Sequence, residues 1–188
     1  MKKSNLYVAL IHYPVYNKNG KVIVTCITGF DLHDIARSAY TYGIKKYYVV
    51  NPLKSQTEFA GRIIGCWKDK KSNKFNPTRV ECFDIVELAD SLESIVADIK
   101  AIDGKMPVVV ATSAKGKGNI KFKDLKKLIL SKKQSYLLLL GSGWGLKKEF
   151  LNDADYILEP IKGPKKYNHL SVRSAAAIIF DRLLSREE

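Results

Sequence analysis

The residues most suited to chemistry lie in the last third of the chain, where a glycine-rich turn follows an apolar run. Residues 136–140 read YLLLL, a continuous apolar segment that is typical of a strand covered on both faces. Gly141, Gly143 and Gly145 follow at once. Because glycine has no Cβ atom, these positions permit sharp turns and a close approach of a ligand to the backbone. The turn can therefore hold a ligand, or it can simply join a strand to a helix.

A dinucleotide is one ligand that such a turn can hold, and Glu159 falls near the position of a ribose-binding acid. The spacing argues against this interpretation. Only residues 146–155 separate the turn from the next expected strand, Tyr156–Leu158. A parallel crossover needs a dozen or more residues, most of them usually helical. The short connection therefore disfavours a dinucleotide site.

Two further loops carry groups suited to ligand binding. Thr112–Asn119 follows the expected strand Pro107–Ala111, and ligands of open α/β sheets bind at the carboxyl ends of strands. It lacks the spacing of a phosphate-binding P-loop, and a plain basic surface loop is the alternative. Ile161–Leu170 contains Gly163, several lysines and His169, and it leads into the last expected helix.

Arg37 lies on an expected helix, away from the apolar stripe of that helix and on the side of Asp34. The planar guanidinium group suits a phosphate or a residue of a partner subunit. A solvated arginine on an exposed helix face is the alternative.

The chain is strongly basic. Its 188 residues carry a formal net charge of +13, with a pI near 9.6, although the apolar and charged fractions are ordinary for a soluble globular protein. This balance favours polyanionic partners, nucleic acid first and an anionic membrane second. Basic residues gather at Lys68–Lys74, Lys115–Lys133 and Lys162–Lys166. A soluble basic protein without such a partner is the alternative.

The cysteines and histidines are widely spaced and form neither a CxxC pair nor a metal-ligand pattern. We therefore expect neither a metal site nor a disulfide framework. The apolar run near the N-terminus is broken by His12 and Pro14 and reads as a strand, not a signal peptide. No apolar run is long enough to span a membrane. A reduced, cytoplasmic location fits these features best.

Hydrophobic periodicity places the secondary structure elements. The expected strands are Leu6–Ile11, Tyr47–Val50, Pro107–Ala111, Tyr136–Leu140 and Tyr156–Leu158, with Val80–Phe83 as a short strand or extended segment. Val22–Thr28 is β-branched and is either a strand or an extended connection. The expected helices are capped by Asp31 and Ser55, cover Asp84–Lys100 and Phe122–Leu130, and end with the segment Ser171–Leu184, which Ser171 caps.

Lys68–Arg79 is polar, basic and rich in turn residues. It is either a mobile loop or an arm for RNA, with Phe75 available to stack on a base. Elsewhere strands and helices alternate, which predicts an α/β fold with a mostly parallel sheet of about five or six strands and helices on both faces. Because we find no internal repeat and no linker, we expect residues 1–188 to form a single domain.

Three segments, in this order, are similar to the motifs of a known family. DLHDIARSAYTYGIKKYYVVNP resembles the first motif, LLLLGSGWGL the second and YILEPIKGPKKYNHLSVRSAAAIIF the third. Their order and spacing and the length of the chain resemble the SPOUT class of S-adenosylmethionine-dependent RNA methyltransferases. Within that class, the chain is similar to an uncharacterised bacterial branch that lacks an extra RNA-binding domain.

The resemblance implies a fold and a cofactor. SPOUT proteins carry a deep C-terminal trefoil knot, a rare feature, in which the last helix passes through a loop. S-adenosylmethionine would bind in the knot, held mainly by backbone groups of three loops. Carried over to this chain, the cofactor-binding residues are Thr112, Ser113, Ala114, Leu140, Gly141, Ser142, Gly143, Gly145, Ile161, Gly163, Tyr167, Asn168 and Leu170.

The resemblance also implies a homodimer whose active site is shared between subunits. Arg37 matches the arginine of the first motif and would contact the phosphate or base of the target nucleotide. Ser171 stands where many ribose-methylating relatives have an asparagine, and the aspartate of the guanine-N1 branch has no clear match. His169 is then the first candidate for the general base, because histidine ordinarily titrates near neutral pH, and Asp34 is the second. A loop histidine that only packs is the alternative.

The implied reaction is physically coherent. Methyl transfer from a sulfonium is an in-line displacement, so alignment of the reactants contributes much of the catalysis. A cationic surface attracts RNA, and Tyr167 or Trp144 could stack on an unstacked nucleotide, although either could instead belong to the core. The expected function is methyl transfer to tRNA or rRNA, without a metal or a membrane. A non-catalytic RNA-binding protein of the same fold and a Rossmann-type enzyme that uses a nicotinamide cofactor are the alternatives.

Overall fold

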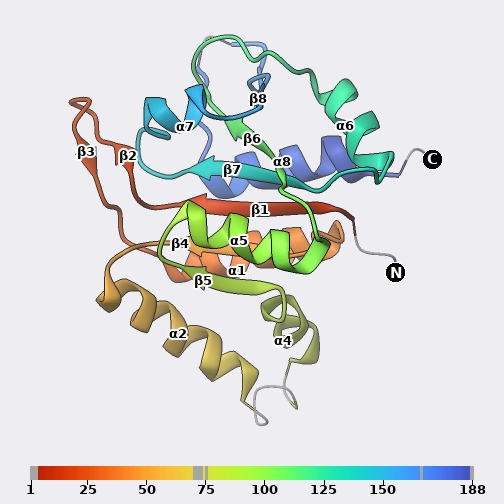
Figure 1. The fold of residues 1–188 in the computed structure, drawn as a ribbon. Coiled ribbons are helices and arrows are strands. Elements are labelled where there is room, and N and C mark those ends of the chain that lie inside the picture. Colours follow the sequence, from red (N-terminus) through yellow and green to blue (C-terminus); the bar gives the residue numbers. More distant parts are fainter. Residues whose placement is uncertain (1–3, 70–73, 75, 166, 187–188) are drawn as a thin grey trace.

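A six-stranded sheet forms the centre of the computed structural model, which describes residues 4–69, 74, 76–165 and 167–186 (Figure 1). Every pairing between its described strands is parallel, which confirms the predicted α/β fold. The strand order is β5 (Val86–Ala89), β4 (Tyr47–Val50), β1 (Leu6–Ile11), β7 (Tyr136–Gly141), β6 (Val108–Thr112) and β8 (Tyr156–Leu158).

β1 occupies the middle of this sheet, between β4 and β7. All of its residues are fully buried, and Val8 lies opposite both Tyr47 and Leu138. A strand that is covered on both faces and both edges needs apolar side chains at every position, which explains its unbroken apolar run. The segments that follow β1 and β7 consequently meet at the middle of the carboxyl edge of the sheet.

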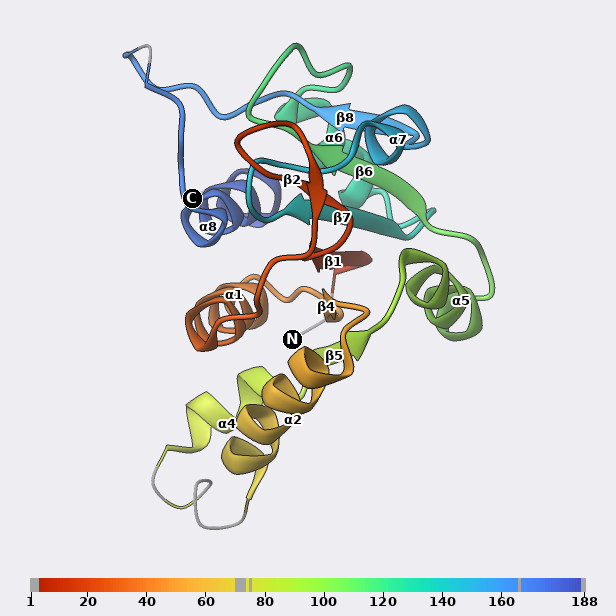
Figure 2. The ribbon, with the colours of Figure 1, turned by 90° about the vertical axis from the view of Figure 1, so that its left-hand side faces the viewer.

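Helices cover both faces of the sheet, as predicted (Figures 1 and 2). One face carries α1 (Gly29–Thr41), α8 (Val172–Leu184) and α6 (Phe122–Leu130), and α2 (Lys54–Lys68) and α4 (Pro77–Phe83) extend this layer beside β5. The other face carries α5 (Leu92–Asp103) and the short α7 (Lys148–Asn152).

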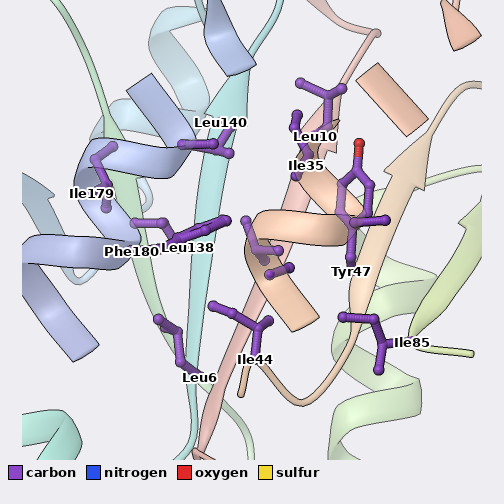
Figure 3. Close-up of a cluster of buried hydrophobic side chains, with 14 of the residues drawn as sticks. Leu6, Leu10, Ile35, Ile44, Tyr47, Ile85, Leu138, Leu140, Ile179 and Phe180 are labelled. Carbon is purple, nitrogen blue, oxygen red and sulfur yellow. The ribbon is translucent and has the colours of Figure 1, made fainter. Parts of the chain in front are cut away.

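The larger core lies between the sheet and the pair α1 and α8 (Figure 3). Leu10 and Leu138 point from the strands towards Ile35 of α1 and Phe180 of α8. Truncating a buried leucine of this kind to alanine typically costs about 2–5 kcal/mol. This packing holds the N-terminal end of α8 near the carboxyl ends of β1 and β7.

Two acidic side chains of α5 attach it to the sheet. Asp103 accepts hydrogen bonds from Tyr7 (2.8 Å) and Ser135 (2.5 Å) and pairs with Lys45. Asp98 accepts a hydrogen bond of 2.5 Å from the hydroxyl of Tyr48. The half-buried carboxylates thus accept hydrogen bonds from the hydroxyl groups of two tyrosines whose side chains are almost fully buried.

A small hairpin, β2 (Val15–Tyr16) and β3 (Val22–Ile23), extends beyond the carboxyl edge of the sheet (Figure 1). Residues 24–28 form an extended connection, so only the start of the β-branched segment is a strand. The hairpin packs on the glycine turn, because Tyr16 N donates to Gly145 O (3.0 Å) and Trp144 N donates to Tyr16 O (2.9 Å).

Two predicted helix starts were wrong. α1 begins at Gly29, because Thr28 is the N-cap and accepts a hydrogen bond from Asp31 N, which makes Asp31 the acidic residue of the first turn. α2 begins at Lys54 after Leu53, which caps it without a side-chain hydrogen bond, so Ser55 is already helical. Ser171 does cap α8, as predicted, by accepting from Ser174 N.

The region of residues 76–103 also differs from the prediction. Val80–Phe83 lies in α4, whose start is set by the side chain of Asn76 and by Pro77. The expected helix Asp84–Lys100 is instead β5 followed by α5, which Ser91 caps. Phe75, the expected stacking residue of an RNA arm, lies outside the described residues.

Candidate functional site

A pocket of about 670 Å³ lies at the carboxyl ends of β1, β7 and β6. This volume falls within the range of roughly 300–1,000 Å³ that is usual for small-molecule sites. Its walls come from five segments that are distant in the sequence: His12, residues 25–31, residues 112–115, residues 140–145 and residues 168–175. A narrower cavity of about 80 Å³ adjoins it and continues between residues 112–114 and the end of β8.

Most of the residues predicted to bind the cofactor come together here. Those lining the larger pocket are Thr112, Ser113, Ala114, Leu140, Gly141, Ser142, Gly143, Gly145, Asn168 and Leu170. Ile161 lines the narrower cavity, whereas Gly163 and Tyr167, although described, line neither. Of the predicted catalytic residues, His169 and Ser171 line the larger pocket.

The glycine turn is shaped largely by the packing of the chain on itself. A Cβ atom at Gly141 would lie 2.7 Å from Leu146 N, and one at Gly143 would lie 3.0 Å from Tyr16 O. Gly143 and Gly145 also have positive φ angles of 58° and 105°, which favour glycine. The turn therefore needs glycine for its own geometry, and that geometry leaves its backbone at the pocket wall.

The loop after β6 is fastened to β8 by a set of backbone contacts. Asn119 N donates to Ile157 O (2.8 Å), and Glu159 N donates to Ile120 O (2.9 Å). A Cβ atom at Gly118 would lie only 2.5 Å from the carbonyl carbon of Leu158, so this close approach requires glycine. The predictions did not identify the role of Gly118.

Glu159 serves a structural purpose that differs from the ribose contact of a dinucleotide site. Its Oε1 atom accepts a hydrogen bond of 2.7 Å from Phe122 N, in the first turn of α6. Lys121, the N-cap residue, makes no side-chain cap bond, so Glu159 supplies the missing acceptor from across the fold. Because the Glu159 carboxylate accepts this bond, its position argues further against a ribose-binding role in a Rossmann-type enzyme.

The segment that precedes α8 closes one side of the pocket. Asn168 Nδ2 donates to Ala114 O (3.2 Å), which joins this segment to the loop after β6. Tyr167 and His169 contact each other edge to face, and Tyr167 is 75% exposed. Trp144 is 52% exposed and lies under the ammonium group of Lys115, so it is not a core residue.

Arg37 and Asp34 lie on α1 outside the walls of the described pocket. Asp34 pairs with Arg173 of α8 (3.2 Å), and Arg173 also approaches Asp31 at 3.7 Å. The guanidinium of Arg173 lies over the ring of the exposed Phe30. Arg173 therefore links α1 to α8 beside the pocket, a role that the sequence did not reveal.

His12 is a candidate that the predictions missed. It follows β1 directly, is 1% exposed and lines the pocket. Its Nδ1 atom lies 2.9 Å from Thr25 Oγ1, whereas its buried Nε2 atom has no hydrogen-bond partner among the described residues. Burial lowers the pKa of His12 to about 4, against the opposing effect of the Asp31 carboxylate. The imidazole is therefore neutral at physiological pH.

The described residues contain no group of three or more histidine, cysteine, aspartate or glutamate side chains that could hold a metal ion. None of the described helices is both long enough and apolar enough to cross a membrane.

Comparison with known proteins agrees with this geometry. The profile of a family described as SAM-dependent RNA methyltransferase matches residues 5–185. An uncharacterized protein of Aquifex aeolicus is 44% identical over 187 residues, which cover 99% of this chain and 91% of that protein. A tRNA (guanine-N(1)-)-methyltransferase of Oleidesulfovibrio alaskensis is 39% identical over 180 residues, 96% of this chain. The chain spans only 42% of that enzyme, so the match does not carry over the activity of the whole enzyme.

A solved structure shares the fold. The SpoU methyltransferase AviRb of Streptomyces viridochromogenes, in complex with its cofactor AdoMet, has a TM-score of 0.57 and 19% identity. The match covers 98% of this chain and 58% of AviRb, and at this identity it supports the fold alone. This match supports the fold that the resemblance to the SPOUT class implies. With a family match that extends over nearly all of its length, the chain belongs to the family of SAM-dependent RNA methyltransferases.

Proposed function

We propose that the protein transfers a methyl group from S-adenosylmethionine to a nucleotide of structured RNA, tRNA or rRNA. The observation that carries the proposal is the convergence of the three predicted cofactor loops on one pocket. tRNA is the first substrate to test, because a relative of the chain is named as a tRNA methyltransferase.

The residues present fit this cofactor. The glycine turn offers backbone groups, and Leu140 and Leu170 offer apolar surface for an adenine ring. We assign the cofactor to the part of the pocket formed by the loops after β6, β7 and β8. When bound there, S-adenosylmethionine supplies a sulfonium-activated methyl group. The part beside β1, lined by His12, Thr25, Cys26 and Asp31, remains for the nucleotide that accepts it.

The charge of the protein supports RNA as the substrate. The net charge is +13, the exposed Lys115 lines the pocket, and Lys117, Lys162 and Lys165 are exposed on the same two loops that contribute residues to its walls. Cationic side chains release counterions when they bind phosphates, so RNA affinity should fall steeply as salt rises. The exposed ring of Trp144, which lies beneath Lys115, and the exposed ring of Tyr167 suit stacking on a base that has left its helix.

We further propose that the protein acts in the cytoplasm as a homodimer in which Arg37 serves the partner's site. Arg37 is exposed on α1 and lies outside the pocket of its own chain. The 70% exposed ring of Phe30, near the start of the same helix, suits burial by a second copy. Light scattering tests the dimer, and Phe30→Asp should shift it towards monomer. An active, monomeric wild-type protein would contradict a shared site.

We also propose that the chain is knotted. β7 leads to β8, which pairs with β6 at the far edge of the sheet, and the chain then returns to α8 in the layer of α1 and α6. On this return the chain contacts the loop 113–121 through Glu159 and Asn168. A crystal structure that traces residues 112–186 would decide whether the segment passes through the loop or around it.

Calorimetry provides the first test of the function. We expect micromolar binding of S-adenosylmethionine and S-adenosylhomocysteine and no binding of NAD. Ala175, which lines both cavities, gives a blocking variant, because Ala175→Phe should fill the space and abolish binding. Ala177→Phe makes the same change two residues along α8, outside both cavities, and should retain binding.

Transfer itself is measured with S-adenosylmethionine labelled in the methyl group and RNA isolated from cells that lack the gene. Label that enters tRNA or rRNA supports the proposal. RNA binding without any binding of the cofactor would instead favour a non-catalytic RNA-binding protein.

A further inference from the structure

We propose that His12 accepts the proton of the atom that becomes methylated, and that this atom therefore carries a hydrogen before the reaction. The acceptor would be a ring or exocyclic N–H of a base or a ribose 2′-hydroxyl. This inference rests on the proposed methyltransferase function and assigns the catalytic base and the chemical class of the acceptor.

A chain of hydrogen bonds sets the direction of each proton around His12. Ser142 Oγ donates to Ile11 O (2.9 Å) and lies 2.6 Å from Thr25 Oγ1. We assign the Ser142 proton to Ile11 O, and in this arrangement Thr25 donates to Ser142 and accepts from His12. The competing contact from Thr25 Oγ1 to His12 O is long, at 3.4 Å, and that carbonyl already accepts from Thr25 N at 2.9 Å.

The tautomer of His12 follows from this chain. In the assigned arrangement the Nδ1 atom carries the proton and donates it to Thr25 Oγ1, which lies 2.9 Å away. In a neutral imidazole the other nitrogen is then an acceptor, so Nε2 presents a lone pair. This atom is buried and lacks a hydrogen-bond partner among the residues described. A buried, unsatisfied acceptor is unfavourable, and because the His12 side chain belongs to the pocket wall, we assign the missing partner of Nε2 to a ligand that donates to it.

The place of His12 in the sheet puts it on the acceptor side of the pocket. His12 directly follows β1. In the sheet, β1 lies on one side of β7, and β6 and β8 lie on the other side. The predicted cofactor loops follow β6, β7 and β8, so His12 borders the site from the remaining side. Asn51 helps to fix this wall, because its Nδ2 atom donates to Thr25 O (3.0 Å). His12 and Thr25 are thus held rigidly where the target nucleotide would enter.

The proton transfer balances without another reactant. The proton of the acceptor N–H or O–H moves to His12 Nε2, and the electron pair of that bond remains on the acceptor atom and forms the bond to the methyl carbon. The pair of the carbon–sulfur bond goes to sulfur, which becomes a neutral thioether. Water takes the proton from the imidazolium after the product leaves. Because burial lowers the pKa of His12 to about 4, this return is downhill at neutral pH.

Nuclear magnetic resonance tests the tautomer without any turnover. In imidazole ¹⁵N spectra of the protein, we expect His12 to show a protonated Nδ1 and an unprotonated Nε2 from pH 8 to pH 5.5. The other titratable groups that line the pocket are Cys26, Asp31, Lys115 and His169, so His169→Gln is used to separate the two imidazole signals. Thr25→Val should shift the proton towards Nε2, and Thr25→Ser should restore it to Nδ1. A proton on Nε2 in the wild-type protein would overturn the assignment.

Kinetics test the role of the base. His12→Gln should lower the single-turnover rate of methyl transfer by about 10²–10⁴-fold. The rate is measured at saturating S-adenosylmethionine, because His12 is connected through Thr25 to Ser142 of a proposed cofactor loop. His33→Gln is the matched control, since His33 is half-buried between Trp67 and Phe83 and lies outside the pocket. It should leave the rate unchanged. If His12→Gln fails to fold, the two Thr25 variants provide the test. The rate of methyl transfer should then be lost in Thr25→Val and retained in Thr25→Ser.

The product gives an independent readout. Mass spectrometry of nucleosides from the methylated RNA should find a neutral product, since a hydrogen leaves as the methyl group arrives. A cationic product, such as a guanine methylated at N7 or an adenine methylated at N1, would overturn the proposal. If the folded His12→Gln variant transfers methyl groups at the wild-type rate, the role of His12 as the base is overturned, while the proposed methyltransferase function stands. Absence of transfer by the wild-type protein would overturn the proposed function and this assignment together.

Discussion

Replacing Gly118 by alanine tests how the pocket loop is held against β8. The added Cβ atom would lie 2.5 Å from the carbonyl carbon of Leu158, closer than carbon atoms approach, and its neighbours are backbone atoms that cannot rotate away. The loop must therefore move, which breaks the hydrogen bonds from Asn119 N to Ile157 O and from Glu159 N to Ile120 O. Each such bond contributes about 1 kcal/mol, and overpacking adds about 1–3 kcal/mol. We expect the free energy of unfolding to fall by about 3–5 kcal/mol.

Urea denaturation followed by tryptophan fluorescence measures this change, and calorimetry with S-adenosylhomocysteine measures its effect on the pocket. Residues 112–115 belong to the displaced loop and line the pocket, so cofactor affinity should fall together with stability. Gly65→Ala is the control, because a Cβ atom at Gly65, in α2, would meet nothing within 4 Å. This control should gain about 0.5–1 kcal/mol through helix propensity. An unchanged unfolding midpoint in Gly118→Ala would refute the argument.

Three further changes test other contacts. Asp103→Asn should lower the free energy of unfolding at pH 7 by about 2 kcal/mol, because the carboxylate accepts charge-assisted hydrogen bonds. Burial acts to raise the pKa of Asp103, but the bonds from Lys45 and its other donors outweigh it, so the pKa is lowered. The ionised carboxylate therefore stabilises the fold at pH values above the pKa of about 3.9 that Asp103 has in the unfolded chain, and this stabilisation is lost as pH falls through its lower pKa in the folded protein. In urea titrations, the difference in free energy of unfolding between Asp103→Asn and wild type should thus shrink towards pH 3. Glu159→Ala should cost about 1 kcal/mol and speed amide exchange in the first turn of α6, where Phe122 N loses its acceptor. Arg173→Ala should cost no more than about 1 kcal/mol, and a loss that persists in 1 M salt would contradict an ionic origin.

The elements that could be predicted from the sequence are those whose apolar pattern depends only on burial, not on a capping residue. β1, β7 and the apolar stripe of α1 appear where their apolar residues indicated, since a buried surface demands apolar side chains whatever its partners are. The errors fall where a cap decides the boundary. Leu88, Leu92, Ile95 and Ile99 have helical spacing, yet Ser91 starts the helix and leaves Leu88 in β5. The cap at Asn76 and Pro77 was visible in the sequence and was overlooked.

The pocket was predicted in part for a related reason. Residues in local motifs, such as the glycine turn and residues 112–114, could be found because their spacing is a signal in itself. His12 depends on Thr25 and Ser142, which are remote from it in the chain and come together only when β1 pairs with β7. One weak signal was present, since His12 ends an otherwise unbroken apolar run. Arg173 was missed likewise, because its partners lie on a helix at the other end of the sequence.

The position of β1 has a consequence for the synthesis of the protein. β1 can pair with β4 once residues 47–50 have been synthesised, but its other edge must wait for residues 136–141. A nascent chain that ends before β7 therefore carries a wholly apolar strand with one open edge, the kind of surface that other chains can extend. The same delay applies to the pocket, whose wall at His12 has no opposite wall until residues 112–115, 140–145 and 168–175 have been synthesised. Until β7 has been made, folding thus depends on whatever keeps the unfinished sheet from pairing with other chains.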